Sequence, residues 1–545
     1  MKTPISARVS QLFSESPLRH ARFRLFYFGA IGTALGYTMQ TTVAAWVMAT
    51  LTPSEFMVAL VQTASTAPAL LFGLVAGALA DIADRRRLIL GTQVALLVAT
   101  AILGAATLAG LASPGTLLAL TFIVGVGLTL YLPAQSANVH DLVARDELPR
   151  AVALNAVAFN VARAVGPALA GGIAAWSGSG SALVLSAICF VPMILAARRL
   201  AKHERKVPGV PETVFSGVLS GLRFARNSPA MRPLLIRNVS FSLCASAFWA
   251  LLPVVARDQL HLGAGGFGLL SAGFGIGAIV GALSMPGQLQ RRSLNVVVTW
   301  ATVLWVGAIA LLAATDLVAL AIVAASVGGA AWVSVLAGVS AGVQTSAPAW
   351  VRARAVSVNM VAMQVSLALG SALWGAAASL FAIRGALVGS AALMLLLLAF
   401  TWHRRVSMGE EADLAPGAQL PDLVLSAEPR PSDGPVLIQL DYRIDDERRA
   451  EFLRVIRGAE SVRRRNGAIS WRVFRDLEED GRFVERFIVA SWAEYIRSRS
   501  RATMADRNVQ DRIEALQRSG VPVRISRLIG VDTESETLTE VMPSD

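Results

Sequence analysis

Two long apolar segments are joined by the stretch Gly77-Ala-Leu-Ala-Asp81-Ile-Ala-Asp84-Arg85-Arg86-Arg87. The first segment ends in this stretch, two carboxylates and three arginines follow, and the second segment begins at Leu88. Charged side chains are costly in hydrocarbon, and arginines collect in short loops at the membrane surface. The stretch therefore predicts a hairpin at a membrane surface that connects two spanning helices.

The composition is that of a polytopic membrane protein. Of 545 residues, 54% are hydrophobic and only 16% are charged, which is outside the range of soluble globular proteins. The net charge of +12 could suggest a nucleic-acid partner. However, 26 Lys and Arg against 11 Asp and Glu precede Arg404, and 23 against 26 make up the rest. The positive excess lies in the apolar part, where arginines contact lipid headgroups, so we expect no nucleic-acid partner.

Apolar runs of about 20 residues, the length that spans a bilayer, recur along the chain. They predict twelve transmembrane helices, at 25–49, 58–80, 88–111, 116–140, 151–175, 181–199, 233–256, 264–288, 294–313, 317–346, 354–378 and 382–402.

The loops between these runs alternate in charge. Every second loop is rich in arginine, whereas the intervening loops hold only Arg257 and Arg384. The positive-inside rule then places both termini on the cytoplasmic side of the membrane. The first run is too long for the apolar core of a cleaved signal peptide, so it is interpreted as a true span.

An internal repeat organises the apolar part. The segment 150–171 aligns with 354–375 at an offset of 204, and the same offset places Gly77 over Gly281 and Arg87 over Arg291. The chain is thus expected to be an all-α membrane protein of two parallel six-helix repeats, with a substrate site at their interface near the middle of the membrane.

The remaining segments complete the domain organisation. Residues 436–531 alternate in the order βαββαβ, which predicts a small cytoplasmic α+β domain of the ferredoxin-like type. The full division is a cytoplasmic N-terminus (1–24), an N-terminal bundle (25–199), a basic linker with an amphipathic helix on the inner leaflet (200–232), a C-terminal bundle (233–402), a flexible linker (403–435), the ferredoxin-like domain (436–531) and a disordered tail (532–545).

The opening stretch resembles the signature of the first cytoplasmic hairpin in the major facilitator superfamily of transporters. That signature has a glycine where this chain has Asp84, and usually a basic residue where it has Ile82. The resemblance implies that Asp81 belongs to a cytoplasmic latch. The expected gate consists of Gly77, Asp81, Asp84, Arg85, Arg86 and Arg87.

Other stretches narrow the resemblance. Gly166-Pro167-Ala-Leu-Ala-Gly171-Gly172 is similar to the glycine–proline motif in the fifth span of exporters, and implies a helix bend at Gly166, Pro167 and Gly171. The stretches 131–135, 145–155 and 344–354 resemble the enterobactin-exporter-like branch of the superfamily, of the transmembrane secretion effector type, which implies a location in the bacterial inner membrane. The C-terminal domain, around 491–495 and 506–507, resembles the antibiotic-biosynthesis-monooxygenase type.

Arg163 is the most informative single residue because it lies midway along a predicted span, whereas all 11 acids before Arg404 lie at span ends or in loops. An arginine in mid-membrane should face a cavity or a partner. One interpretation is an anionic substrate, and the other is structural pairing with carbonyls and amides. The expected cavity residues are Arg163, Asn160, Asn155, Phe159, Gln40, Asn359 and Gln364.

These features together predict a secondary exporter of siderophore-like or drug-like molecules that works by alternating access, with proton coupling expected from the family. A multidrug exporter of cationic or neutral compounds is the alternative, and a membrane-tethered enzyme or sensor that uses the C-terminal domain is a rival of another class. Without a phosphate-binding loop or a cysteine-rich motif, no catalytic residue, cofactor or metal is expected. The expected partners are lipid, a small substrate that is anionic under the first interpretation of Arg163, and a second copy bound through the C-terminal domain.

Overall fold

The computed structural model describes residues 17–82, 84–144, 147–199, 214–348, 350–409, 415 and 429–531. The side chains of several residues in helices, including Asp81 and Asn160, are not described. The predicted tail, residues 200–213 of the basic linker, residues 410–414 and 416–428 of the flexible linker, and the first 16 residues lie outside the described part. The chain forms two compact units, the membrane unit (1–211, 236–339 and 359–405) and the terminal unit (212–235, 340–358 and 406–545).

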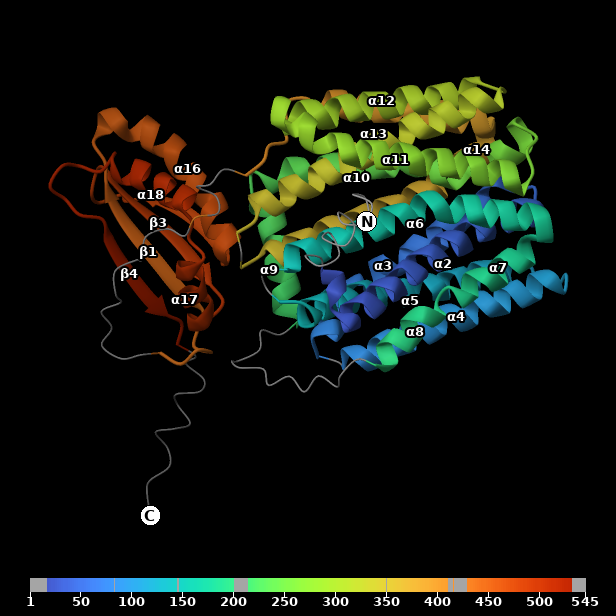
Figure 1. Cartoon of the computed structure of the whole chain (residues 1–545). Helices are drawn as coiled ribbons and strands as arrows, with labels where there is room; N and C mark the ends of the chain where they lie inside the picture. Colours follow the sequence, from blue (N-terminus) through green and yellow to red (C-terminus); the bar gives the residue numbers. More distant parts are fainter. Residues whose placement is uncertain are drawn as a thin grey trace, which may run out of the picture. The chain divides into compact units, whose positions relative to one another are not determined.

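Long helices make up the membrane unit (Figure 1). Each of the twelve predicted segments is helical. The helices, after a short turn η1 (Pro17–Arg19), are α2 (Ala21–Leu51), α3 (Glu55–Ile82), α4 (Arg85–Leu108), α5 (Pro114–Leu142), α6 (Leu148–Ser177), α7 (Ser179–Ile188), α8 (Val191–Arg198), α10 (Met231–Val254), η2 (Val255–Gln259), α11 (Ala264–Arg291), α12 (Leu294–Ala314), α13 (Val318–Ser346) and α14 (Arg352–Phe400).

Three predicted spans differ from a simple helix. The sixth is divided into α7 and α8 at Cys189. The last two spans form the single element α14, which is broken by non-helical backbone at Phe381 and Ala382. Nine helices in the described residues are long and apolar enough to cross a membrane. Helices α2 and α6 are not among the nine, and α14 is counted once, so the count of twelve crossings stays a prediction.

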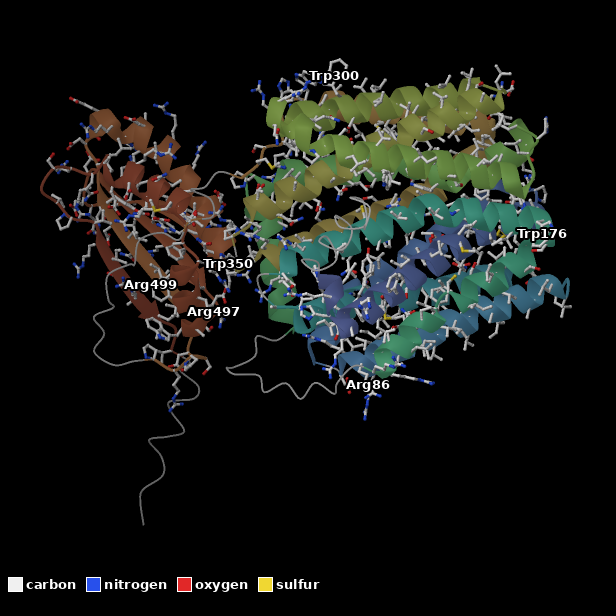
Figure 2. The ribbon with its side chains drawn as sticks, in the orientation of Figure 1. Arg86, Trp176, Trp300, Trp350, Arg497 and Arg499 are labelled. Carbon is white, nitrogen blue, oxygen red and sulfur yellow. The ribbon has the colours of Figure 1, made fainter. Side chains whose placement is uncertain are left out.

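The surface of the membrane unit carries large apolar side chains. Trp176 is 90% exposed and Trp300 is 64% exposed, and both are labelled in Figure 2. Leucines on other helices are also exposed, including Leu71 of α3, Leu283 of α11 and Leu396 of α14. Exposed apolar surface on this scale is unfavourable in water and is the normal outer face of a bundle in lipid.

The terminal unit contains a four-stranded antiparallel sheet with the strand order β2-β3-β1-β4. This is the order expected for a ferredoxin-like βαββαβ chain. Its elements are β1 (Val436–Arg443), η3 (Asp446–Arg448), α16 (Arg449–Asn466), β2 (Ala468–Arg475), β3 (Arg482–Val489), α17 (Trp492–Ser500), α18 (Met504–Glu514) and β4 (Arg524–Ile529). The short helix α17 was not predicted.

One face of this sheet holds the core of the domain. Ile438, Leu440 and Tyr442 of β1 are buried together with Phe452 and Ile456 of α16. Alternate residues of a strand point to the same face, so this pattern is the one that the sequence predicts. The core also contains the fully buried carboxylate of Glu485.

Helix α9 (Val214–Asn227) also belongs to the terminal unit. The sequence predicts that its apolar stripe lies on the inner leaflet of the membrane. In the structure, however, Phe224 and Ala225 from this stripe are buried and α9 packs against α16. This part of the stripe therefore contacts protein. An amphipathic pattern predicts a buried face, but it does not distinguish lipid from protein as the covering surface.

Candidate functional site

Within the membrane unit, the two helical halves (α2–α8 and α10–α14) meet at the end of the bundle that the charge pattern predicts to be extracytoplasmic, called here the outer end. A Cβ atom added to Gly171 of α6 would lie 2.6 Å from the Cα of Gly268 in α11. The rings of Trp46 and Phe267 stack with centroids 5.8 Å apart. Glycines let the two backbones approach closely, so the outer end is closed in this conformation.

At the outer end, the side chain of Arg257 forms hydrogen bonds that join the two halves. It lies in η2, where its guanidinium forms a fork with Asp258 at 2.5 and 2.6 Å. Its Nη1 donates to the backbone oxygens of Ala49 and Thr52, the latter at 3.0 Å. These carbonyls lie at the C-terminal end of α2. Backbone acceptors at that end lack helical partners, so a positively charged donor near them is favourable.

Replacing Arg257 with glutamine should loosen the outer end. Hydrogen bonds from a charged group contribute about 1.5–3 kcal/mol, and partial exposure reduces this, so we expect the outer end to open about five to ten times more often. The labelling rate of a cysteine placed at the buried Val47 measures this opening. The matched control is Arg384→Gln, which removes an exposed ion pair with Asp316 inside one half. Equal labelling rates in both variants would contradict the role of Arg257.

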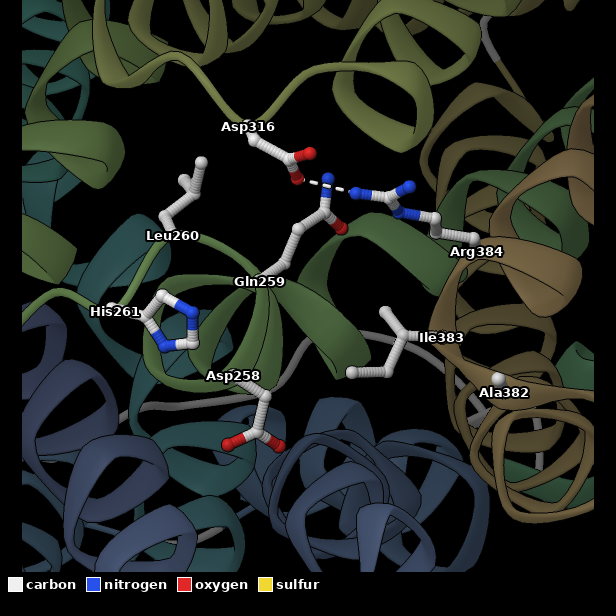
Figure 3. Close-up of a pocket in the computed structure, with 8 residues that line it drawn as sticks. All are labelled: Asp258, Gln259, Leu260, His261, Asp316, Ala382, Ile383 and Arg384. Carbon is white, nitrogen blue, oxygen red and sulfur yellow. Dashed lines mark hydrogen bonds and ion pairs between the residues drawn. The ribbon is translucent and has the colours of Figure 1, made fainter.

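A cavity of about 630 Å³ also lies at the outer end, and Figure 3 shows it with the Arg384–Asp316 ion pair. The amide of Gln259 donates to the carbonyls of Leu312 and Thr315, at 3.0 and 2.7 Å. The lining residues are Asp258, Gln259, Leu260, His261, Asp316, Ala382, Ile383 and Arg384. None of them is among the predicted substrate residues.

At the opposite, inner end, the predicted gate residues have distinct local roles. The carboxylate of Asp84 accepts a hydrogen bond from the backbone nitrogen of Arg86 at 2.9 Å and so caps the start of α4. Arg85 donates to the carbonyl of Ala137 in α5 at 3.2 Å. The side chain of Asp81 is not described, so its latch role stays a prediction.

Sequence reasoning missed a second contact at the inner end. Glu147, which precedes α6, is 6% exposed and pairs with Arg19 at 2.7 Å and with His20 at 2.8 Å. The contact joins the start of α2 to the start of α6, inside one half. The available signal was the acidic pair Asp146 and Glu147 between Arg145 and Arg150.

Arg163 lies midway along α6 and is only half-buried. In the described part of the chain, its guanidinium has neither a carboxylate partner nor a hydrogen-bond partner. Its guanidinium lies over the ring of Trp249 of α10, 5.8 Å from the centroid, and Tyr37 of α2 is near enough for an electrostatic interaction. Residues from three helices and from both halves therefore contribute to this site.

Trp249 belongs to an aromatic cluster in the second half. Its ring lies 4.5 Å from that of Phe274 and 6.0 Å from that of Trp332, measured between centroids. Trp305 and Phe248 extend the cluster. Aromatic rings in such a cluster hold one another in place, so Trp249 presents a fixed ring face to Arg163.

The other predicted cavity residues are not gathered around Arg163 by any described contact. Gln40 is fully buried, and neither its amide nitrogen nor its amide oxygen has a hydrogen-bond partner in the described structure. The Oδ1 atom of Asn155 is likewise buried without a partner there. Asn359 is buried and accepts a hydrogen bond from Asn238 at 2.8 Å. Phe159 and Gln364 are half-buried, and the side chain of Asn160 is not described. A substrate role for these residues stays a prediction.

The glycine–proline motif supports close packing in α6. Thr38 donates to the carbonyl of Ala162 at 3.1 Å, and a Cβ atom on Gly166 would collide with the Thr38 side chain. Helix α6 continues through Pro167 without interruption. The predicted bend at Gly166, Pro167 and Gly171 is therefore still a prediction.

Comparison with known proteins now identifies the family. The model of the transmembrane secretion effector family, a branch of the major facilitator superfamily, matches residues 13–535. The chain belongs to this family of transporters. The match runs from the first helix through the C-terminal domain.

Individual relatives of this transporter are distant. It is 25% identical over 248 residues to the staphyloferrin A transporter of Staphylococcus aureus, and 25% identical over 229 residues to an uncharacterized transporter of the same superfamily from Sinorhizobium fredii. These matches cover 45% and 40% of this chain, and only 62% and 55% of the relatives.

Solved structures of other transporters share the fold. A bacterial homologue of the human lysosomal transporter Spinster, in an inward-facing and unoccupied conformation, superposes with a TM-score of 0.58 at 14% identity, over 71% of this chain and 97% of that one. The nucleoside transporter NupG superposes with a TM-score of 0.55 at 15% identity, over 70% and 98%. At this identity the likeness concerns the fold alone.

Proposed function

We propose that this transporter exports small anionic molecules of the siderophore class across the bacterial inner membrane, by alternating access of its two halves. The observation that carries the proposal is Arg163, a half-buried guanidinium in mid-helix without a carboxylate partner in the described structure, which lies over the ring of Trp249. An anionic ligand would supply the missing partner. The relation to the staphyloferrin A transporter supports this substrate class.

Alternating access is supported by the distribution of contacts between the halves. At the outer end, Gly171, Gly268 and Arg257 hold α6, α11 and the end of α2 together. A conformation closed at that end is one of the two states that such a cycle requires. Export and proton coupling follow the family expectation, with the termini in the cytoplasm as the arginine-rich loops predict.

Transport by the purified protein in liposomes tests this proposal. We expect an outward-directed flux of a citrate- or catechol-type siderophore that exceeds the flux of a cationic dye, and that increases when a proton gradient is imposed. The matching cellular assay compares siderophore secretion under iron limitation with drug sensitivity in a deletion strain. Flux of the dye alone would favour a multidrug exporter of cationic compounds and would refute the anionic assignment.

A further inference from the structure

The terminal unit brings together three stretches that are distant in sequence. Helix α9 precedes α10, the segment 340–358 connects α13 to α14, and the C-terminal domain follows the linker. A Cβ atom added to Gly221 of α9 would lie 2.9 Å from the Cβ of Arg354. Helix α9 therefore lies directly against this segment, and the domain contacts both.

The contact of the domain is centred on an aromatic pair. Phe224 of α9 and Trp350, which is labelled in Figure 2, meet edge to face with centroids 6.1 Å apart. Arg501 of the domain lies 4.4 Å from the Trp350 centroid, and Arg465 lies 5.9 Å from that of Phe224. Arg501 is only 7% exposed. A cation that stacks on a ring away from water binds more strongly than one at an exposed site.

One carboxylate positions this contact. Glu494 accepts hydrogen bonds from Arg501 and Arg497, both at 2.8 Å, and lies 3.9 Å from Arg223 of α9. Arg223 also donates to the carbonyl of Gly467 at 3.0 Å. Glu494 thus aligns the guanidinium that stacks on Trp350 and attracts the arginine of α9.

We propose that the C-terminal domain is a docked clamp that holds α9 and the segment 340–358 together and thereby sets how often the transporter changes conformation. This inference rests on the transport function proposed above. Helix α9 leads into α10, and the segment 340–358 contains the end of α13 and the start of α14. Three long helices are therefore attached to the clamped stretches.

The direction of the effect follows from linkage. A contact shifts the balance between two conformations by the difference in its free energy between them, so a clamp that is weakened when α10, α13 and α14 move favours the conformation in which it is formed. The clamp is formed in a conformation whose outer end is closed, so docking favours this state. Loss of docking favours opening of the outer end.

Hydrogen exchange in the full-length protein, embedded in lipid nanodiscs, tests the clamp. In Trp350→Ala and in Glu494→Gln we expect the exchange rate of α9 amides to increase about tenfold, as loss of a desolvated cation–π contact implies. The labelling rate of a cysteine at Val47 should increase several-fold in the same variants. Trp350→Phe keeps a ring for Arg501, so both of its rates should lie between those of the wild type and of Trp350→Ala. Such a graded effect distinguishes loss of the contact from misfolding.

The control variant is Arg507→Gln, which removes an exposed i,i+4 ion pair with Asp511 on α18 and should leave both rates unchanged. Unchanged exchange of α9 in Trp350→Ala and Glu494→Gln would refute docking. Faster exchange with an unchanged labelling rate would show that the domain docks without controlling the outer end, and would overturn the proposal. Because neither measurement uses a substrate, a failure of the proposed substrate class is distinguished from a failure of the clamp.

Discussion

Replacing Arg163 with glutamine is expected to lower transport of an anionic substrate by about ten- to a hundredfold. Hydrogen bonds that involve a charged group contribute about 1.5–3 kcal/mol, and each 1.4 kcal/mol is a factor of ten. Glutamine keeps much of the length and one amide donor, but it removes the charge and the contact with Trp249. The measurement is siderophore flux from proteoliposomes at equal protein content.

The amount of folded protein separates a substrate role from a structural one. A charged residue in mid-membrane costs about 2.5–3.5 kcal/mol on insertion scales. If Arg163 serves the substrate, Arg163→Gln should therefore insert at least as well as the wild type. Arg163→Lys keeps the charge but loses the planar fork, and it should recover part of the flux.

Arg291→Gln is the matched control for this series. It removes an exposed arginine at the end of α11 and should leave the flux unchanged. Normal transport of the anionic substrate by Arg163→Gln at normal protein levels would refute the assignment of Arg163. A fall in folded protein without a change in flux per molecule would support the structural interpretation instead.

The helices of the membrane unit could be predicted closely because the bilayer fixes their length. The predicted segment 264–288 became α11 (Ala264–Arg291), and 151–175 became α6 (Leu148–Ser177). Hydropathy could not predict which side chains meet. Trp249 and Arg163 belong to different halves, and only the packed structure brings the ring to the guanidinium.

The sequence also contains capping residues that mark two helix starts. Ser491 accepts a hydrogen bond from the backbone nitrogen of Glu494 and caps α17, so the Ser491-Trp-Ala-Glu494 pattern could have predicted this missed helix. Asp84, where the superfamily signature has glycine, caps α4. For α9 the apolar stripe was recognised, but its partner was not, since a lipid surface and a protein surface require the same pattern.

Replacing Glu485 with glutamine is expected to destabilise the C-terminal domain by about 3 kcal/mol near neutral pH. Breaking a buried ion pair by removing one partner leaves the other charge uncompensated. Glu485 is fully buried and accepts from Arg463 at 3.0 Å, from Trp471 at 2.8 Å and from Tyr442 at 3.0 Å. Hydrogen exchange of the β1 and β3 amides in the full-length protein measures the loss.

The matched control is Glu460→Gln, which removes an exposed i,i+4 pair with Arg464 and should change the free energy of unfolding by less than about 0.5 kcal/mol. An equal effect of both variants would contradict a special role for the buried pair.

The pH dependence of the Glu485→Gln effect has a definite sign. Burial alone would raise the pKa of Glu485, but Arg463 and the hydrogen bonds from Trp471 and Tyr442 outweigh burial and hold the pKa below its ordinary value. The ordinary pKa of a glutamate in an unfolded chain is about 4.3. The stabilisation is therefore fully present above about pH 4.3 and is lost as the pH falls through the lower, folded-state pKa. The difference in protection between the wild type and Glu485→Gln should be constant near neutral pH and shrink only in acid. A difference that shrinks already between pH 7 and pH 6 would show that another group controls it.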